Sequence, residues 1–158
     1  MEEELQLQKI GQEQVLVYGV PDALSTLLTR SFPTGKWINY LSSLVASNKG
    51  DGVCITLLND YFILLMIQNG KPHFVNYFNK SGDDQNQYLV LNACIQANIQ
   101  PKDTNLNVIG YSADRDLWMQ ALASYFAGAH MQQVPDEGIG ATLNTDYPNH
   151  HYAPYFIF

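Results

Sequence analysis

The segment from Gly52 to Asn79 constrains the fold more than any other part of the sequence, because three apolar runs are separated there by two short turns. The second turn contains Asn69 and Gly70, and both residues tolerate the positive φ angles of a type I′ β-hairpin turn. The runs predict strands at residues 53–58, 61–68 and 72–79. The middle run is apolar almost throughout, which predicts a strand with both faces buried in a mixed sheet covered by helices.

The next part of the chain alternates helices with strands. Apolar residues at helical spacing predict a helix at residues 85–98, which Pro101 prevents from continuing. A strand is predicted at 106–110, a second helix at 117–127 with Gly128 just after its C-terminus, and a short final strand at 130–134. The resulting order is three strands, helix, strand, helix, strand.

The first part of the chain has a different pattern. Residues 1–12 are polar and predict either a frayed end or a partial strand, and residues 15–20 predict a strand that ends at Pro21. Asp22 is the predicted cap of a helix at 23–30. A second strand is predicted at 36–41 and a short helix or turn at 42–47, before five turn-forming residues at 48–52 that predict a domain boundary.

Composition excludes several classes of partner. The chain has 158 residues, of which 46% are apolar and 15% charged, enough for one core or two small lobes. Its net charge of -7 and eight Lys and Arg argue against binding to nucleic acid through phosphates. No apolar run approaches the roughly 20 residues that span a bilayer, and the acidic first residues do not resemble a signal peptide. We therefore expect a cytoplasmic protein without membrane insertion.

Several short stretches, taken in order along the chain, carry a resemblance to a known family. They are Val17–Pro21, Phe32–Pro33, Tyr61–Phe62 followed by Asn69–Gly70, Asn76–Asn79 and Leu106–Gly110. Together they resemble the DUF3822 family, bacterial proteins of undetermined function with an actin-like ATPase fold, similar in architecture to the pilus assembly protein PilM. The order of the predicted elements is also that of the ribonuclease H-like subdomain, which actin, sugar kinases and Hsp70 chaperones use twice.

The resemblance implies an α/β fold in which residues 49–140 form a ribonuclease H-like (actin-like ATPase) lobe with a mixed sheet in the order βββαβαβ. Residues 1–48 would form a partial βαβα lobe, an incomplete first actin-like lobe without its opening three strands, and residues 141–158 an aromatic tail. The predicted strands at 15–20 and 36–41 would then have open edges, which proteins seldom leave unpaired. We expect these edges to pair between chains.

Actin-like ATPases hold nucleotide phosphates on hairpin turns that contain glycine, because a backbone without side chains can bring several N–H groups to one phosphate. The equivalent turn here contains Asn59 and Asp60 and no glycine. Gly110 follows the strand near which such folds contact adenosine, but a second glycine is missing. A nucleotide cleft, with ATP and magnesium as ligands, would therefore consist of Asn59, Asp60 and Gly110, and hydrolysis is not expected.

Other chemistries find less support. A nuclease of the ribonuclease H type needs a carboxylate on its first strand, where this chain has Cys54 to Thr56. His150 and His151 are adjacent and point in opposite directions on an extended segment, so no metal site is predicted. Cys54 and Cys94 fall within apolar patterns and predict buried free thiols, with a disulfide as the less favoured alternative. No catalytic residue is predicted.

Aromatic residues close the chain. Tyr152, Tyr155, Phe156 and Phe158 either complete the core or form a docking strip that adds to a partner's sheet as an edge strand. The sequence thus favours a non-catalytic binding or scaffold module whose partner is another protein or a second copy. The alternative is a degenerate actin-like protein that binds ATP.

Overall fold

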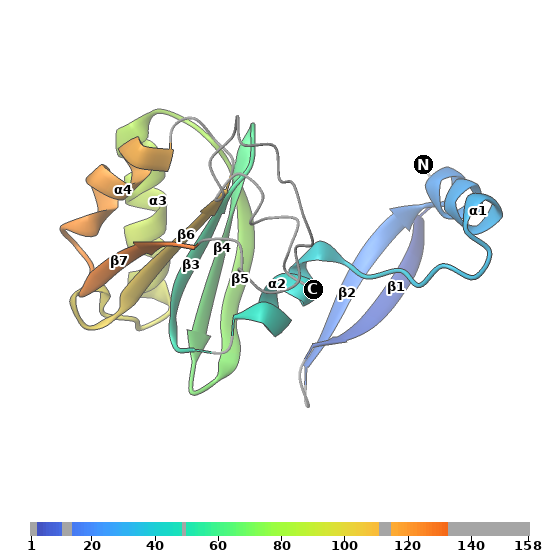
Figure 1. Cartoon of the computed structure of the whole chain (residues 1–158), viewed down its shortest axis with the longest axis horizontal. Coiled ribbons are helices and arrows are strands. Elements are labelled where there is room, and N and C mark those ends of the chain that lie inside the picture. The colour runs from blue at the N-terminus through green and yellow to red at the C-terminus, as the bar shows by residue number, and fades with distance from the viewer. Residues whose placement is uncertain (1–2, 11–13, 49, 111–114, 133–158) are drawn as a thin grey trace, which may run out of the picture. The chain divides into compact units, whose positions relative to one another are not determined.

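The structure, a computed structural model, describes residues 3–10, 14–48, 50–110 and 115–132. The chain divides into two compact units, an N-terminal unit of residues 1–48 and a C-terminal unit of residues 49–157 (Figure 1). The predicted tail at 141–158 lies outside the described residues, and the interpretation of residues 1–48 as an incomplete actin-like lobe stays a prediction.

A five-stranded mixed sheet forms the centre of the C-terminal unit. Its strands are β3 (Gly52–Leu57), β4 (Tyr61–Gln68), β5 (Lys71–Asn79), β6 (Asn105–Gly110) and β7 (Gly128–Met131). They lie in the order β5-β4-β3-β6-β7, with the first three antiparallel and β6 and β7 parallel to β3. The predicted meander and mixed sheet are confirmed.

Two helices, α3 (Asp83–Gln96) and α4 (Arg115–Ala123), lie on the same side of this sheet (Figure 1). Alternate residues of β3, β4 and β6 point toward them and form one continuous apolar core with both helices. The members of this core are Val53, Ile55, Leu57, Phe62, Leu64, Met66, Val90, Ala93, Cys94, Ala97, Ile99, Leu106, Val108, Trp118, Leu122 and Phe126.

The opposite side of the sheet is buried as well. Its buried residues are Cys54, Thr56, Ile63, Leu65, Ile67 and Ile109. The prediction that the middle strand has two covered faces is therefore confirmed, since six consecutive residues of β4 are buried.

The end of α4 differs from the prediction. The helix stops at Ala123, and Gly128 begins β7 rather than following a helix C-terminus. The intervening residues form turns that place Phe126 in the core. The N–H of Ala127 lies 3.2 Å from the carbonyl oxygen of Pro101 and 3.0 Å from that of Thr104, which ties this loop to the short 3-10 helix η1 (Pro101–Asp103). Tertiary hydrogen bonds thus end the helix one turn early.

The N-terminal unit contains a two-stranded antiparallel hairpin of β1 (Glu3–Ile10) and β2 (Gln14–Pro21), followed by α1 (Asp22–Ser31) and α2 (Tyr40–Ser47). Residues 3–10 therefore form a regular strand, with Glu3 paired with Pro21. Among the described residues no helix combines the length and the apolar character needed to cross a membrane.

Two predictions for this unit are wrong. Residues 36–39 have no regular structure and α2 begins at Tyr40, so no strand exists at 36–41. The reason is local: the side-chain oxygen of Asn39 accepts a hydrogen bond from the N–H of Leu41 at 2.9 Å, which caps the helix. Asp22 is the first residue of α1 rather than its cap, because Pro21 occupies the cap position and no side chain caps this helix.

Candidate functional site

The residues predicted for a nucleotide cleft come together at one end of the five-stranded sheet. Strands β3 and β6 are parallel, and Leu57 near the end of β3 pairs with Gly110 at the end of β6. Asn59 and Asp60 follow Leu57 by two and three residues, in the turn that leads into β4. The carboxyl end of parallel strands is where open α/β sheets usually bind ligands, so the location suits a cleft.

The backbone of this turn does not suit a phosphate. A nest for an anion forms where successive N–H groups point to one side, in a turn that contains residues in the left-handed conformation. Among the described non-glycine residues, positive φ angles occur at Asn69 and Asn98 and not at Asn59 or Asp60. The N–H of Leu58 donates to the carbonyl oxygen of Tyr61 at 3.0 Å. The carbonyl oxygen of Asp60 accepts from the backbone N–H of Lys80 at 2.9 Å. These bonds close the turn as part of the sheet.

Gly110 has a structural reason to be glycine. Its φ angle is 149°, a value that residues with a side chain rarely adopt. A Cβ atom there would lie 2.5 Å from the carbonyl oxygen of Leu57 and 2.8 Å from its Cβ. The close pairing of β6 with β3 therefore requires glycine at this position, whether or not a ligand binds nearby.

An anion-binding turn does exist at the opposite end of the sheet, and a side chain of the protein itself occupies it. Asn69 and Gly70 adopt φ angles of 55° and 68°, as predicted for the β4–β5 hairpin. Their N–H groups donate to the Asp51 carboxylate at 2.9 Å and 2.8 Å, respectively. Both hydrogen bonds lower the pKa of Asp51, and the bond from Gly70 has the larger effect. Sequence reasoning treated Asp51 only as part of a linker.

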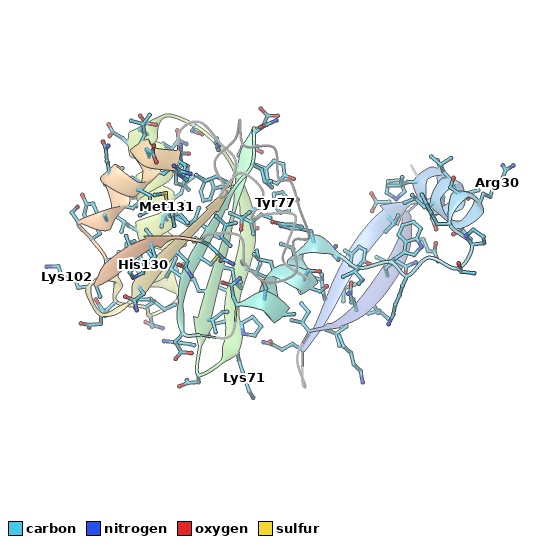
Figure 2. The ribbon with its side chains drawn as sticks, in the orientation of Figure 1. Arg30, Lys71, Tyr77, Lys102, His130 and Met131 are labelled. Atoms are coloured by element: carbon cyan, nitrogen blue, oxygen red, sulfur yellow. The ribbon has the colours of Figure 1, made fainter. Side chains whose placement is uncertain are left out.

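A polar pocket of about 310 Å³ adjoins this clamp. It is lined by Asp51, Gly52, Ile67, Gln68, Asn98, Ile99, Gln100, Asp103, Thr104 and Asn105. Both oxygens of the Asp51 carboxylate already accept backbone hydrogen bonds from the hairpin turn. Lys71, at the start of β5 next to that turn, extends from the same end of the sheet (Figure 2).

A second pocket, of about 320 Å³, lies between α3 and α4. The side-chain amide of Gln87 donates to the carbonyl oxygen of Ala121 at 2.8 Å and joins the two helices there. Trp118 lines the pocket and packs edge-on against Phe62, with ring centroids 4.7 Å apart, so this side of the pocket belongs to the core. The sequence offered no sign of it, because it depends on how two helices cross.

Both cysteines are free and buried, as predicted. Burial raises the pKa of Cys54 to about 12 and that of Cys94 to about 11, which keeps both thiols protonated and unreactive. No three His, Cys, Asp or Glu residues of the described ranges gather in a way that could hold a metal ion. His130, one of the four residue types considered, lies on β7 at the edge of the sheet (Figure 2).

Exposed apolar residues of the N-terminal unit gather on one face of its hairpin, here called the Leu5 face. Its apolar members are Leu5 and Leu7 of β1 and Val15 and Val17 of β2, each between 52% and 73% exposed. Sequence reasoning missed it because residues 1–12 were considered mostly polar. The alternation of Leu5 and Leu7 with glutamines was the available signal. Tyr152, Tyr155, Phe156 and Phe158, the predicted docking strip, lie outside the described residues.

Comparisons with known proteins agree with this architecture. A family model described as "Protein of unknown function (DUF3822)" matches residues 2–128. A solved structure from Bacteroides thetaiotaomicron VPI-5482, described as a protein with actin-like ATPase fold and unknown function, matches with a TM-score of 0.70 and 15% sequence identity. The match covers 82% of this chain and 54% of the other, so the chain spans about half the length of that protein. No curated protein matches the chain. The predicted α/β, actin-like fold class is confirmed.

Proposed function

The chain belongs to the DUF3822 family of proteins of unknown function, whose model it matches over most of its length, and we propose that it acts as a non-catalytic binding or scaffold module of actin-like fold. Its ligand in this proposal is another protein chain. The observation that carries the proposal is the turn at Asn59 and Asp60, where neither residue has a positive φ angle and no glycine is present.

The chemistry of the remaining described residues supports the same conclusion. Both thiols are buried and protonated, and the one turn that binds an anion uses the carboxylate of Asp51. A turn that already holds an internal carboxylate has its two N–H groups satisfied. A protein with these features is better suited to recognise a partner by shape and apolar surface than to stabilise a developing charge.

A thermal-shift experiment with ATP and magnesium tests the proposal. A ligand at 100 times its dissociation constant adds about 2.7 kcal/mol to the free energy of unfolding, which is a shift of several degrees for a chain of this size. We expect no shift beyond that produced by magnesium alone. A saturable shift with ATP would overturn the proposal.

A double variant, Asn59→Ala with Asp60→Ala, serves as the matched control for that experiment. Each protein is compared with its own ligand-free melting temperature, so any change in stability caused by the substitutions cancels. A shift that the wild type shows and the variant loses would locate the nucleotide at the β3–β4 turn. A shift that both proteins show would locate it elsewhere.

The second candidate is a degenerate actin-like protein that binds ATP without hydrolysing it. It is favoured by the pairing of Leu57 with Gly110, which brings the β3–β4 turn and the end of β6 to the same end of the sheet. A nucleotide bound there would rely on side chains rather than on a backbone cradle.

The aromatic tail belongs to the proposal as a partner-binding strip. Tyr152, Tyr155, Phe156 and Phe158 would add to a partner's sheet as an edge strand. Deleting residues 152–158 should abolish partner capture and leave the melting temperature unchanged. A truncated chain that melts at a clearly lower temperature would show that these residues complete the core instead.

A further inference from the structure

The two faces of the β1–β2 hairpin differ in what they contact. On one face, the Glu4 carboxylate accepts a hydrogen bond from the Ser25 hydroxyl at 2.7 Å, and the Gln8 side chain accepts one from the N–H of Asn39 at 2.8 Å. These bonds tie that face to α1 and to the segment before α2. The other face is the Leu5 face, whose four large apolar side chains are exposed. A two-stranded hairpin with an open apolar face is marginally stable in water.

We propose that the Leu5 face binds the same face of a second copy of this chain, around a two-fold axis, to form a small sandwich of two hairpins. The inference rests on the proposed function as a protein-binding module and names its partner. An isologous interface of this kind requires a surface that is complementary to itself.

The charges on β1 meet this requirement. Along the Leu5 face, β1 presents Glu3, Leu5, Leu7 and Lys9 in that order, and the two charged residues are exposed. Gln6 of β1 pairs with Tyr18 of β2 at the middle of the hairpin. A two-fold axis can lie midway between two hairpins, parallel to the line that joins Gln6 to Tyr18. Such an axis stacks β1 antiparallel on β1 of the second copy. Glu3 then faces Lys9 of the second copy, and Leu5 faces Leu7, twice in each dimer.

The side chains on β2 are complementary to themselves in shape as well. The same axis places Val17 opposite Gly19 of the second copy, because these two residues are equally distant from Tyr18. Gly19 has no side chain and leaves room for the valine. In the single chain the Glu3 side chain lies over Gly19. If the Glu3 side chain turned toward Lys9 of the second copy, it would no longer cover Gly19.

The size of the surface determines the expected affinity. Two strands of eight residues present a face of about 26 Å by 10 Å, or about 260 Å² on each copy, so the interface is smaller than that of stable dimers and belongs with weak, transient contacts. Sandwiched sheets keep their strands within about 30° of each other, which the long side chains of Glu3 and Lys9 can span. We therefore expect a weak, reversible dimer with a dissociation constant of about 100 μM to 1 mM.

Sedimentation equilibrium of the full chain from about 10 μM to about 1 mM tests the inference. The wild type should dimerise. Glu3→Lys or Lys9→Glu alone should weaken the dimer about tenfold or more, since like charges would face each other twice. The double variant with both substitutions keeps the net charge of the wild type and restores opposite charges. It should return the dissociation constant to within about threefold of the wild type.

Two further variants separate the Leu5 face from other exposed apolar residues. Leu7→Ser should abolish the dimer, whereas Leu27→Ser on α1, which removes a leucine that is 60% exposed, should leave it unchanged. Circular dichroism of each variant verifies that the substitutions, all at exposed positions, preserve the fold.

A wild type that remains monomeric at every concentration would overturn the inference and leave this face to another polypeptide. Single charge reversals without effect, or a double reversal that fails to restore the dimer, would also overturn it. These results identify or exclude a second copy as the partner, whereas a saturable shift with ATP in the thermal-shift experiment would overturn the proposed function itself. The two failures can therefore be told apart.

Discussion

The two units of this chain differ in how their apolar residues are used. In the C-terminal unit, sixteen buried residues from the sheet, both helices and the segments after them form one core. In the N-terminal unit, α1 has no buried residue and the Leu5 face of the hairpin is open to water. Since burial of apolar area is the main force that stabilises folded chains, we expect the C-terminal unit to be stable by itself and the N-terminal unit to need further contacts.

The largest effect should come from separating the units. Residues 49–158 alone are expected to unfold cooperatively in urea, because the continuous core lies between Val53 and Phe126. Residues 1–48 alone should be largely unfolded by circular dichroism, since a two-stranded hairpin is marginal by itself. A cooperative transition for residues 1–48 would remove the contrast between the units.

The contrast should also appear in single substitutions. Phe62 is fully buried, and its ring contacts those of Trp118 and Phe78 at centroid distances of 4.7 Å and 5.2 Å. Phe62→Ala should lower the free energy of unfolding by about 3–5 kcal/mol. Leu7→Ala, at a position that is 73% exposed, should change it by less than about 0.5 kcal/mol below the concentration at which dimers form. Urea unfolding measures both, and equal losses would contradict the comparison.

Within the C-terminal unit, the close approach of two strands predicts a smaller loss. Gly110→Ala should destabilise the protein by about 1–3 kcal/mol, because the residue has a φ angle of 149° and its new Cβ would meet the backbone of Leu57. Gly50→Ala is the matched control, since nothing lies within 4 Å of a Cβ there. It should be neutral or slightly stabilising. If both variants lost the same stability, the contact with Leu57 would not be the cause.

The smallest effect concerns the Asp51 clamp and depends on pH. Hydrogen bonds from Gly70 and Asn69 hold the pKa of Asp51 below its ordinary value of 3.8 in the folded state. The unfolded chain therefore binds a proton more readily, and the clamp contributes stability above pH 3.8 that is lost as the pH falls through the lower, folded pKa.

Asp51→Asn removes this dependence. Urea unfolding at a series of pH values should show the wild type more stable than the variant near neutral pH, with the difference shrinking as the pH falls below 3.8. A difference that stayed constant with pH would mean that the carboxylate charge does not contribute. Asp60→Asn, in the other turn of the meander, is a control for the general effect of removing a carboxylate.

Much of the C-terminal unit could be predicted because its signals are local. The Asn69–Gly70 turn and the apolar run of β4 depend on backbone preferences and on burial of consecutive residues, both visible in the sequence. The prediction of a strand at 36–41 was wrong because Asn39 caps a helix that begins at Tyr40, and residues 36–38 pair with no described strand despite the β-preference of Trp37 and Ile38. The early end of α4 depended on hydrogen bonds to Pro101 and Thr104, which are distant in sequence.

The candidate sites show the same division. The sequence alone indicated that the turn at Asn59 and Asp60 lacks glycine, and the backbone angles agree with that deficiency. It could not show that Gly110 packs closely against Leu57, or that the Asp51 carboxylate accepts hydrogen bonds from the hairpin turn. Those contacts join segments that only the paired strands bring together.

The amino-acid pattern was therefore sufficient for the order of elements in the C-terminal unit, the central buried strand and the lack of glycine in the turn at Asn59 and Asp60. Periodicity and turn chemistry act over a few residues and can be recognised without a structure. That Glu3, Leu5, Leu7 and Lys9 lie in a row on one open face became visible only in the folded chain. The reason is that pairing and register, which are nonlocal, determine which side of a strand meets water.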